Sequence, residues 1–321
     1  MNNDDTLKTL KPRHRLEVAV RTLLSPAAGG RSENQDNYLV IDADGNARYL
    51  DNQQQACRRV EGWPEGHVRL AILDGMGGHT HGREAAEKTV AGLLRIAPTA
   101  DLARLSAGLE ALHAQLHQEM HVGLENPGCT LTLVEIPPAQ PALLFHAGDS
   151  RLYALDASGP ACLTIDHVPA TKYAIHGYLT EADWTRQVFE QPHSLLCQAF
   201  VLGNNLGSQA DYADGINAGL FELHDSNLPP FLRGCGDRRP ITLESHRVYL
   251  LASDGLWHLD RPMDFISRWP DILVRPDRPL DGLLEDLFDA LVQESASEAW
   301  LPGDNCTAVA FRLAPPAGGD A

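Results

Sequence analysis

The sequence lacks closely spaced cysteine pairs, a long apolar run and the pattern of a signal peptide in its first residues. Its six cysteines are scattered with no Cys-x-x-Cys pair, so neither a disulfide framework nor a zinc site is indicated. No apolar run approaches the ~20 residues that span a bilayer. Met1 to Asp5 has no basic-then-apolar signal pattern. We therefore expect free thiols in a reducing compartment and predict a cytoplasmic protein.

Basic residues are also scarce. Lys and Arg number 26 against 43 Asp and Glu, which gives a formal charge of -17. This charge keeps a protein soluble, but it opposes binding to the phosphates of nucleic acid and to anionic membranes. We expect no nucleic acid and no membrane as partners.

Linkers rich in Pro or Ser are missing as well, so nothing divides the 321 residues into separate domains. Hydrophobic residues make up 43% of the chain, enough for a substantial core. We predict a monomer with a single domain over residues 16–313. A flap or insertion is expected at about 168–239, and residues 1–15 and 314–321 are expected to be flexible ends.

The sequence does contain a buried strand that ends in an acidic, glycine-rich turn. Residues 68–73 are rich in apolar side chains, and the chain then reads Asp74-Gly75-Met76-Gly77-Gly78-His79. A carboxylate at a strand end is held rigidly, and adjacent glycines let a main-chain carbonyl approach whatever the carboxylate binds. Taken alone, such a turn is more often an ordinary strand exit than a site.

Recurrence gives this turn its weight. Other acidic residues stand in similar turns at strand edges: Asp36, Asp149, Asp254 and Asp304. If these edges converge, they form an oxygen-only pocket that needs cations, because clustered carboxylates repel one another. Oxygen ligands select Mg or Mn over zinc or copper, and two such ions can activate water and clamp a phosphoryl group. The residues predict metal-assisted phosphoester hydrolysis.

Arg31 lies five positions before Asp36 in one of these turns. An arginine is suited to bidentate capture of a phosphate oxyanion. A plain structural salt bridge with Asp36 would account for the pair equally well, so the residues alone leave both interpretations open.

Periodicity predicts strands and helices around the turns. Strands are expected at 16–23, 130–136, 142–146, 151–155, 247–252 and 307–313. Helices are expected at 81–94, 102–120 and 283–292, and Thr180 with Asp183 indicates another helix start. We interpret 45–66 as a loop or extended hairpin and 204–239 as a long irregular insertion or flap. His113, His117 and His121 share one helical face. Metal binding by this face is one alternative, but exposed histidines are commoner on helices, and we assign them no role.

The order of the turns resembles that of the metal-dependent Ser/Thr protein phosphatases of the PPM (type 2C) family, bacterial type. The similarity runs from about residue 16 to 313, and its motifs are Arg31...Asn34-Gln35-Asp36, Asp74-Gly75-Met76-Gly77-Gly78-His79, Gly128-Cys129-Thr130, Gly148-Asp149-Ser150-Arg151, Asp166-His167, Leu202-Gly203, Ser253-Asp254-Gly255-Leu256-Trp257 and Asp304-Asn305. Each motif is modest, but the ordered series is specific. The resemblance implies an α+β fold, a four-layer α-β-β-α sandwich of two antiparallel sheets flanked by helices, with metals at one end between the sheets.

The resemblance also implies roles for single residues. Asp74 would bridge two Mn²⁺ or Mg²⁺ ions, with Asp254 and Asp304 completing the first site. The Gly75 carbonyl would serve the second, supported through water by Asp36. Asp149 matches a ligand of the third, weaker metal of bacterial-type members, and Arg31 matches the arginine that grips phosphate.

Three positions depart from the family pattern. Gln35 stands where many members have a glutamate, and Met76 stands where animal-type members have a histidine proposed as general acid. His258 stands where a further aspartate for the third metal often lies.

The function implied by the resemblance is hydrolysis of phosphoserine or phosphothreonine on a protein, by a water activated between two ions, in opposition to a Ser/Thr kinase. Two alternatives stay open. One is a catalytically weak member that docks a partner through its insertions. The other is a phosphatase for a small phosphorylated metabolite.

Overall fold

The structure is a computed structural model of the 321-residue chain. It describes residues 15–25, 32–76, 81–121, 126–191, 195–208, 216–297 and 303–314. Arg31 and the motif residues 77–79 lie outside the described residues. The ends predicted to be flexible also lie outside the described residues, apart from Arg15 and Ala314, which are the outermost residues of two strands.

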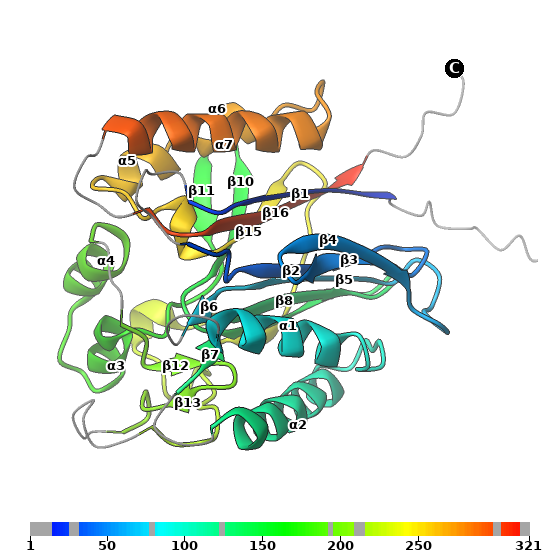
Figure 1. Cartoon of the computed structure of the whole chain (residues 1–321). Helices are drawn as coiled ribbons and strands as arrows, with labels where there is room; N and C mark the ends of the chain where they lie inside the picture. The colour runs from blue at the N-terminus through cyan, green and yellow to red at the C-terminus, as the bar shows by residue number, and fades with distance from the viewer. Residues whose placement is uncertain are drawn as a thin grey trace, which may run out of the picture.

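Two antiparallel sheets form the centre of the molecule (Figure 1). The seven-stranded sheet consists, in spatial order, of β14 (Arg238–Ile241), β9 (Ala142–Ala147), β8 (Leu131–Ile136), β5 (Val68–Leu73), β2 (Asn37–Ile41), β3 (Asn46–Asp51) and β4 (Gln54–Arg59). The five-stranded sheet consists of β1 (Arg15–Leu23), β16 (Cys306–Ala314), β15 (Val248–Ala252), β10 (Arg151–Asp156) and β11 (Gly159–Cys162). Two short pairs are β6 (Gly75–Met76) with β7 (Gly128–Cys129) and β12 (Gln198–Ala199) with β13 (Gly203–Asn204).

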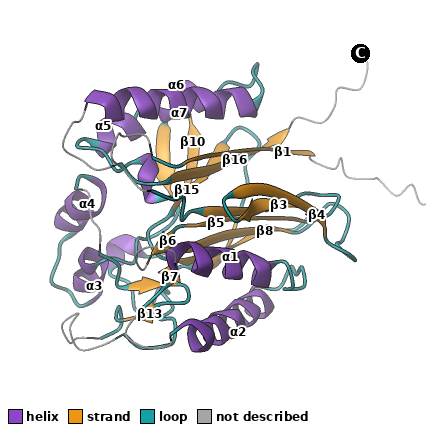
Figure 2. Cartoon of the chain, viewed as in Figure 1, coloured by secondary structure: helices purple, strands orange, loops and turns teal. Residues whose placement is uncertain are grey.

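Helices cover the outer face of each sheet, which gives four layers (Figure 2). The helices on the seven-stranded sheet are α1 (His81–Leu93) and α2 (Leu102–Met120). Those on the five-stranded sheet are α5 (Pro262–Ile266), α6 (Trp269–Leu273) and α7 (Leu280–Ser297). The predicted α+β sandwich of four layers is confirmed. No helix in the described ranges combines the length and apolarity that crossing a membrane would require.

Strand β5 shows how the layers are held together. All six of its residues are buried, and alternation along the strand divides them between two cores. Leu70 and Ile72 belong to the core between the sheets, together with Phe311 from β16. Ala71 and Leu73 belong to the core under α1 and α2. A strand that is covered on both faces needs apolar side chains on both, which explains the unbroken apolar run from Leu70 to Leu73.

The sequence prediction for the helix histidines is wrong. His113 is 2% exposed, its Nε2 lies 2.7 Å from the Ala218 carbonyl oxygen, and its Nδ1 accepts the Val201 N–H at 2.9 Å. His117 and His121 also bond to main-chain carbonyls of covering loops. Periodicity could not reveal the burial of His113, because Val201 and Ala218, to which it bonds, are distant in sequence.

The segment of the chain between β11 and β14 forms a separate hydrophobic core, outside the two sheets. It contains α3 (Pro169–Ile175), α4 (Glu181–Phe189) and the 3₁₀ turn η2 (Pro230–Leu232). This region occupies the range predicted as a flap, and α3 and α4 lie at one end of the sandwich (Figure 1). The interpretation of 204–239 as irregular misses the start of β14, where Pro240 is tolerated because β14 is an edge strand. Residues 45–66 contain the β3–β4 hairpin.

Candidate functional site

The acidic turns of the seven-stranded sheet are neighbours because of its register. Asn37, the first residue of β2, lies opposite Leu73, the last residue of β5. Asp36 and Asp74 are the next residues outward on these antiparallel strands. The start of β2 and the end of β5 therefore bring these two carboxylates to the same edge.

The register of the five-stranded sheet likewise brings Asp149, Asp254 and Asp304 to one edge. Ala252 at the end of β15 lies opposite Ala308 near the start of β16, and β10 begins opposite Ala252 as well. Asp254 follows β15, Asp304 precedes β16, and Asp149 precedes β10. The turn that contains Asp149 passes from β9 in one sheet to β10 in the other, so this acid stands where the sheets meet.

Hydrogen bonds join the two halves. Ser253 Oγ donates to Asp36 Oδ2 at 2.7 Å, and the main-chain N–H of Gln35 donates to Asn305 Oδ1 at 2.8 Å. Asp36 is thereby fixed against the turns that carry Asp254 and Asp304.

Glycine permits the closest of these approaches. A Cβ on Gly255 would overlap the carbonyl oxygen of Asn305. The 3₁₀ turn η3 (Asp254–Leu256) can lie against the start of β16 only because position 255 has no side chain. Glycine is therefore required after Asp254 for the turn to pack against Asn305.

Thr130 connects Asp74 with the Asp149 turn. The Asp74 N–H donates to Thr130 Oγ1 at 2.9 Å, and the Thr130 N–H donates to the Asp74 carbonyl at 2.8 Å. Thr130 Oγ1 also lies 2.6 Å from Ser150 Oγ, next to Asp149. Both main-chain groups of Asp74 are thus fixed by hydrogen bonds to Thr130.

The five acids share one electrostatic environment. Asp36 is 2% exposed; burial raises its pKa to about 7, and the charges of Asp304 and Asp254 add to the rise. Burial also raises the pKa of Asp74 well above its usual range, and Asp36, Asp254, Asp304 and Asp149 all push it further. Asp36 and Asp74 therefore hold protons more tightly than an exposed aspartate does, because burial and the neighbouring acids both oppose their negative charge.

The donor chemistry fits hard divalent cations. Asp36 Oδ1 is buried and makes no hydrogen bond to any described residue, although a buried carboxylate oxygen without a partner is costly. Among the described ranges, no three His, Cys, Asp or Glu side chains stand as a preformed metal cluster. The acids therefore influence one another electrostatically without forming a closed coordination shell. Donor sets made of oxygen atoms alone suit Mg²⁺ or Mn²⁺.

Arg31, the predicted phosphate ligand, lies outside the described residues. Gly75 is buried in β6, opposite Cys129 of β7, while Met76 and His258 are partly exposed. The assignments of Asp36, Asp74, Gly75, Asp149, Asp254 and Asp304 as metal ligands stay predictions.

Residues that the sequence argument missed are the polar supports of the site. Ser253 and Thr130 stand inside recognised motifs but carry no charge, so the search for carboxylates passes over them. Their adjacency to acidic turns is the signal that could have identified them. Cys306 was also missed: its thiol is buried, and burial, followed by the charges of the nearby acids, raises its pKa well above the usual value.

Arg151 binds the flap region to the site. Its Nη2 donates to Asp166 Oδ2 and to the Val188 carbonyl of α4, each at 2.8 Å. The guanidinium carbon lies 4.6 Å from the ring centroid of Phe189 and 4.5 Å from that of Trp257. The start of β10, helix α4 and the turn after Asp254 are therefore held by one side chain.

Comparisons with known proteins agree with this architecture. No family model matches the chain. The serine/threonine protein phosphatase PstP of Mycobacterium tuberculosis is 39% identical over 94 residues, which are 27% of this chain and 18% of that protein. The match therefore spans about a fifth of the relative's length.

Solved structures match along nearly the whole chain. The serine/threonine phosphatase of S. agalactiae has 19% identity and a TM-score of 0.60, over 93% of this chain and 99% of that one. The catalytic domain of PstP in complex with two manganese ions has 21% identity and a TM-score of 0.55, over 94% and 99%. The chain thus has the fold of the PPM-type serine/threonine phosphatases.

Proposed function

We propose that this protein is a metal-dependent phosphatase that hydrolyses phosphoserine and phosphothreonine on proteins. The observation that carries the proposal is the electrostatic coupling of Asp74 with Asp36, Asp149, Asp254 and Asp304 at the edge where the two sheets meet. Five carboxylates from separate turns would be a destabilising arrangement unless cations are bound there. The name of PstP and the fold shared with named phosphatases support the same reaction class.

Two Mn²⁺ or Mg²⁺ ions, when bound, would activate a water and neutralise charge on the phosphoryl oxygens. Asp74 would hold both ions, Asp254 and Asp304 the first, and the Gly75 carbonyl with Asp36 the second. Asp149 would hold a third. The two manganese ions in the PstP catalytic domain support this count for the first pair. The fixed main chain of Asp74 keeps its carboxylate in place while the substrate is exchanged.

Substrate recognition would depend on charge. Arg31 would grip the phosphate by paired hydrogen bonds. The acidic surface of the chain disfavours extended nucleic acid, so a phosphorylated side chain on a protein is the substrate class we propose. Such an enzyme would act as a monomer in the cytoplasm and would oppose a Ser/Thr kinase.

The test is hydrolysis of a phosphothreonine peptide by the full chain with Mn²⁺, before and after addition of excess EDTA. We expect activity that EDTA abolishes and that Asp254→Asn lowers by at least about a hundred-fold, the upper end of what losing a supporting group costs in metal sites. Asp156→Asn is the matched control, because Asp156 is paired with Arg247 at the far end of β10.

Full activity in EDTA would contradict the proposal. Mn²⁺ binding without hydrolysis would favour the partner-binding alternative. Turnover of a panel of small phosphorylated metabolites that exceeds turnover of the peptide would move the substrate class away from proteins.

A further inference from the structure

His167 stands at the centre of a buried hydrogen-bond network behind the Asp149 turn. It lies between β11 and α3 and is completely buried. The proposed reaction gives this histidine no task. Burying an imidazole is costly unless its nitrogens and the groups around it are satisfied, so its partners indicate what it does.

The first partner is Gly148, the residue before Asp149. The main-chain N–H of Gly148 donates to the ring atom Nδ1 of His167 at 3.1 Å, and the main-chain N–H of His167 donates to the Gly148 carbonyl at 2.8 Å. Gly148 has a φ of +123°, and a Cβ there would lie 2.6 Å from the Thr130 Cβ. The turn is therefore clamped between Thr130 on one side and His167 on the other.

The second partner is Gln198 in β12. Its Nε2 donates to His167 Nδ1 at 3.0 Å. Nδ1 thus accepts two hydrogen bonds and carries no proton, which places the ring proton on Nε2 and leaves the imidazole neutral. Burial, and then the nearby His146, lowers the pKa of His167 well below its usual range, which is consistent with this tautomer.

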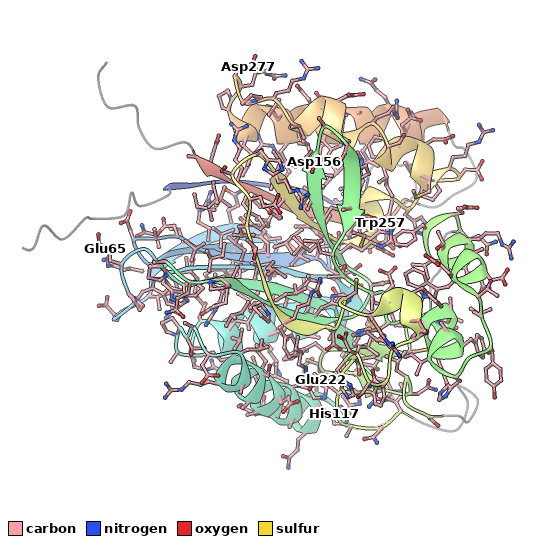
Figure 3. The ribbon with its side chains drawn as sticks, turned by 180° about the vertical axis from the view of Figure 1, so that it is seen from behind. Glu65, His117, Asp156, Glu222, Trp257 and Asp277 are labelled. Carbon is pink, nitrogen blue, oxygen red and sulfur yellow. The ribbon has the colours of Figure 1, made fainter. Side chains whose placement is uncertain are left out.

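Gln198 joins His167 to the insertion. Its Oε1 accepts the Phe221 N–H at 2.6 Å and its Nε2 donates to the Phe221 carbonyl at 3.0 Å. The Gln198 side-chain amide thus bonds to both main-chain polar groups of Phe221, as a neighbouring β-strand would. Residues 216–223 run beside α2, where Figure 3 labels Glu222 close to His117, and Ala218 bonds to His113 of the same helix.

Asp237 closes the network from the other end of the insertion. Its Oδ2 accepts the Leu223 N–H at 3.1 Å and lies 3.6 Å from His167 Nε2. Among the described residues, His167 Nε2 and Asp237 Oδ1 make no hydrogen bond. Burial raises the pKa of Asp237 to about 8. Two segments of the insertion therefore converge on one imidazole.

We propose that His167 is a positioning residue for Asp149, and that residues 216–237 act through Gln198 and Asp237 to hold it. The insertion thereby sets how tightly the Asp149 site binds its ion. The inference rests on the proposed function, in which Asp149 is a ligand of the third and weakest Mn²⁺. It gives the insertion a role in metal affinity rather than in docking a partner.

The experiment measures Mn²⁺ binding to the full chain by calorimetry, together with the Mn²⁺ concentration that gives half-maximal hydrolysis. His167→Leu removes the Nδ1 acceptor. It should weaken the weakest Mn²⁺ site about ten-fold while sparing the tighter sites, the usual effect of losing a group that orients a ligand. His167→Asn should restore most of this affinity, because the amide Oδ1 can occupy the place of Nδ1 and accept the Gly148 N–H.

Two further variants separate positioning from general damage. Gln198→Met keeps the His167 side chain but removes the hydrogen bonds that join it, through Gln198, to Phe221. It should shift the same site in the same direction, which also covers failure of His167→Leu to fold. His67→Leu is the matched control. It removes another buried histidine with a hydrogen bond, at the opposite end of the sheet, so it should lower the melting temperature without changing Mn²⁺ affinity.

A double-mutant cycle gives the sharpest outcome. In an Asp149→Asn background, His167→Leu should cause no further loss of Mn²⁺ affinity. Equal Mn²⁺ binding in His167→Leu, His67→Leu and wild type would overturn this inference alone. Absence of Mn²⁺ binding by the wild-type chain would overturn the proposed function and the inference with it.

Discussion

Two buried acids at opposite ends of the sandwich differ in how their charge is balanced. Glu135 is 0% exposed and Asp36 is 2% exposed. Burial opposes charge on Glu135, but hydrogen bonds from His67 and Arg69 outweigh it and lower its pKa. Burial of Asp36 is not outweighed, and its pKa rises to about 7. Figure 3 labels Glu65, in the loop before β5, and Trp257, in the turn after β15, on opposite sides of the view.

The difference teaches where each counter-charge comes from. Arg69 Nε lies 2.6 Å from Glu135 Oε2, and His67 Nε2 lies 2.7 Å from Oε1. The chain supplies its own cation at this end. At the other end the Asp36 carboxylate accepts a hydrogen bond from the Ser253 hydroxyl, which carries no charge. Under the proposed function, a metal ion from solution would supply the counter-charge at that end.

The largest expected effect comes from breaking the internally balanced pair. Arg69→Met would leave Glu135 buried with an uncompensated charge and would free the carbonyls of Leu93 and Ile96 that Arg69 also binds. We expect a loss of about 3–5 kcal/mol in the free energy of unfolding, measured by urea denaturation. The specific activity of the folded fraction should not change. A stability loss below about 1 kcal/mol would mean that the pair contributes no more than a surface ion pair.

The next effect has the opposite sign on stability. Asp74→Asn should lower the rate of Mn²⁺-dependent hydrolysis at least about a hundred-fold. It should nevertheless raise the melting temperature measured in EDTA. The reason is that one of several mutually repelling carboxylates is removed from a buried site. Differential scanning calorimetry in EDTA tests the stability change. A lower melting temperature would show that the acids are balanced from within the chain.

The smallest effect is a difference in pH dependence. The folded chain holds the Asp36 proton more tightly than the unfolded chain, because its pKa is raised from 3.8 to about 7. In EDTA this stabilising contribution is complete below about pH 4 and is lost as pH rises to about 7. Glu135, whose pKa is lowered, contributes stability above its ordinary pKa and loses it in acid.

Melting temperatures from pH 4 to 8 test this difference, and the slope that Asp36→Asn removes belongs to Asp36. We expect the variant to gain on the wild type as pH rises in EDTA, and expect saturating Mn²⁺ to cancel that gain. Parallel curves for the two proteins would contradict the raised pKa.

Local signals predicted most of the elements. The Thr180 cap is confirmed, since its Oγ1 accepts the Asp183 N–H at 3.2 Å and α4 begins at Glu181. The helix predicted at 102–120 matches α2, because leucines spaced three and four residues apart form one buried face of a helix. Helix 81–94 and the last strand are likewise close to their observed bounds.

Long-range contacts were beyond such signals. The turn at Gly148 reads as a link between consecutive strands, yet β9 and β10 belong to different sheets. Residues 163–167 form no strand, and β11, which was not predicted from the sequence, precedes them. The burial of His113 depends on loops about a hundred positions away. Such facts follow from how segments pack, which no local pattern records.

The order of strands in the five-stranded sheet affects how the protein is made. β1 lies at the sheet edge, and its nine residues pair with β16, the last strand of the described residues. A ribosome therefore releases β1 long before its partner exists. Until β16 has been made, β1 has no partner strand and Asp304 has not yet joined the other acids, and an unpaired edge strand of this kind is prone to aggregation.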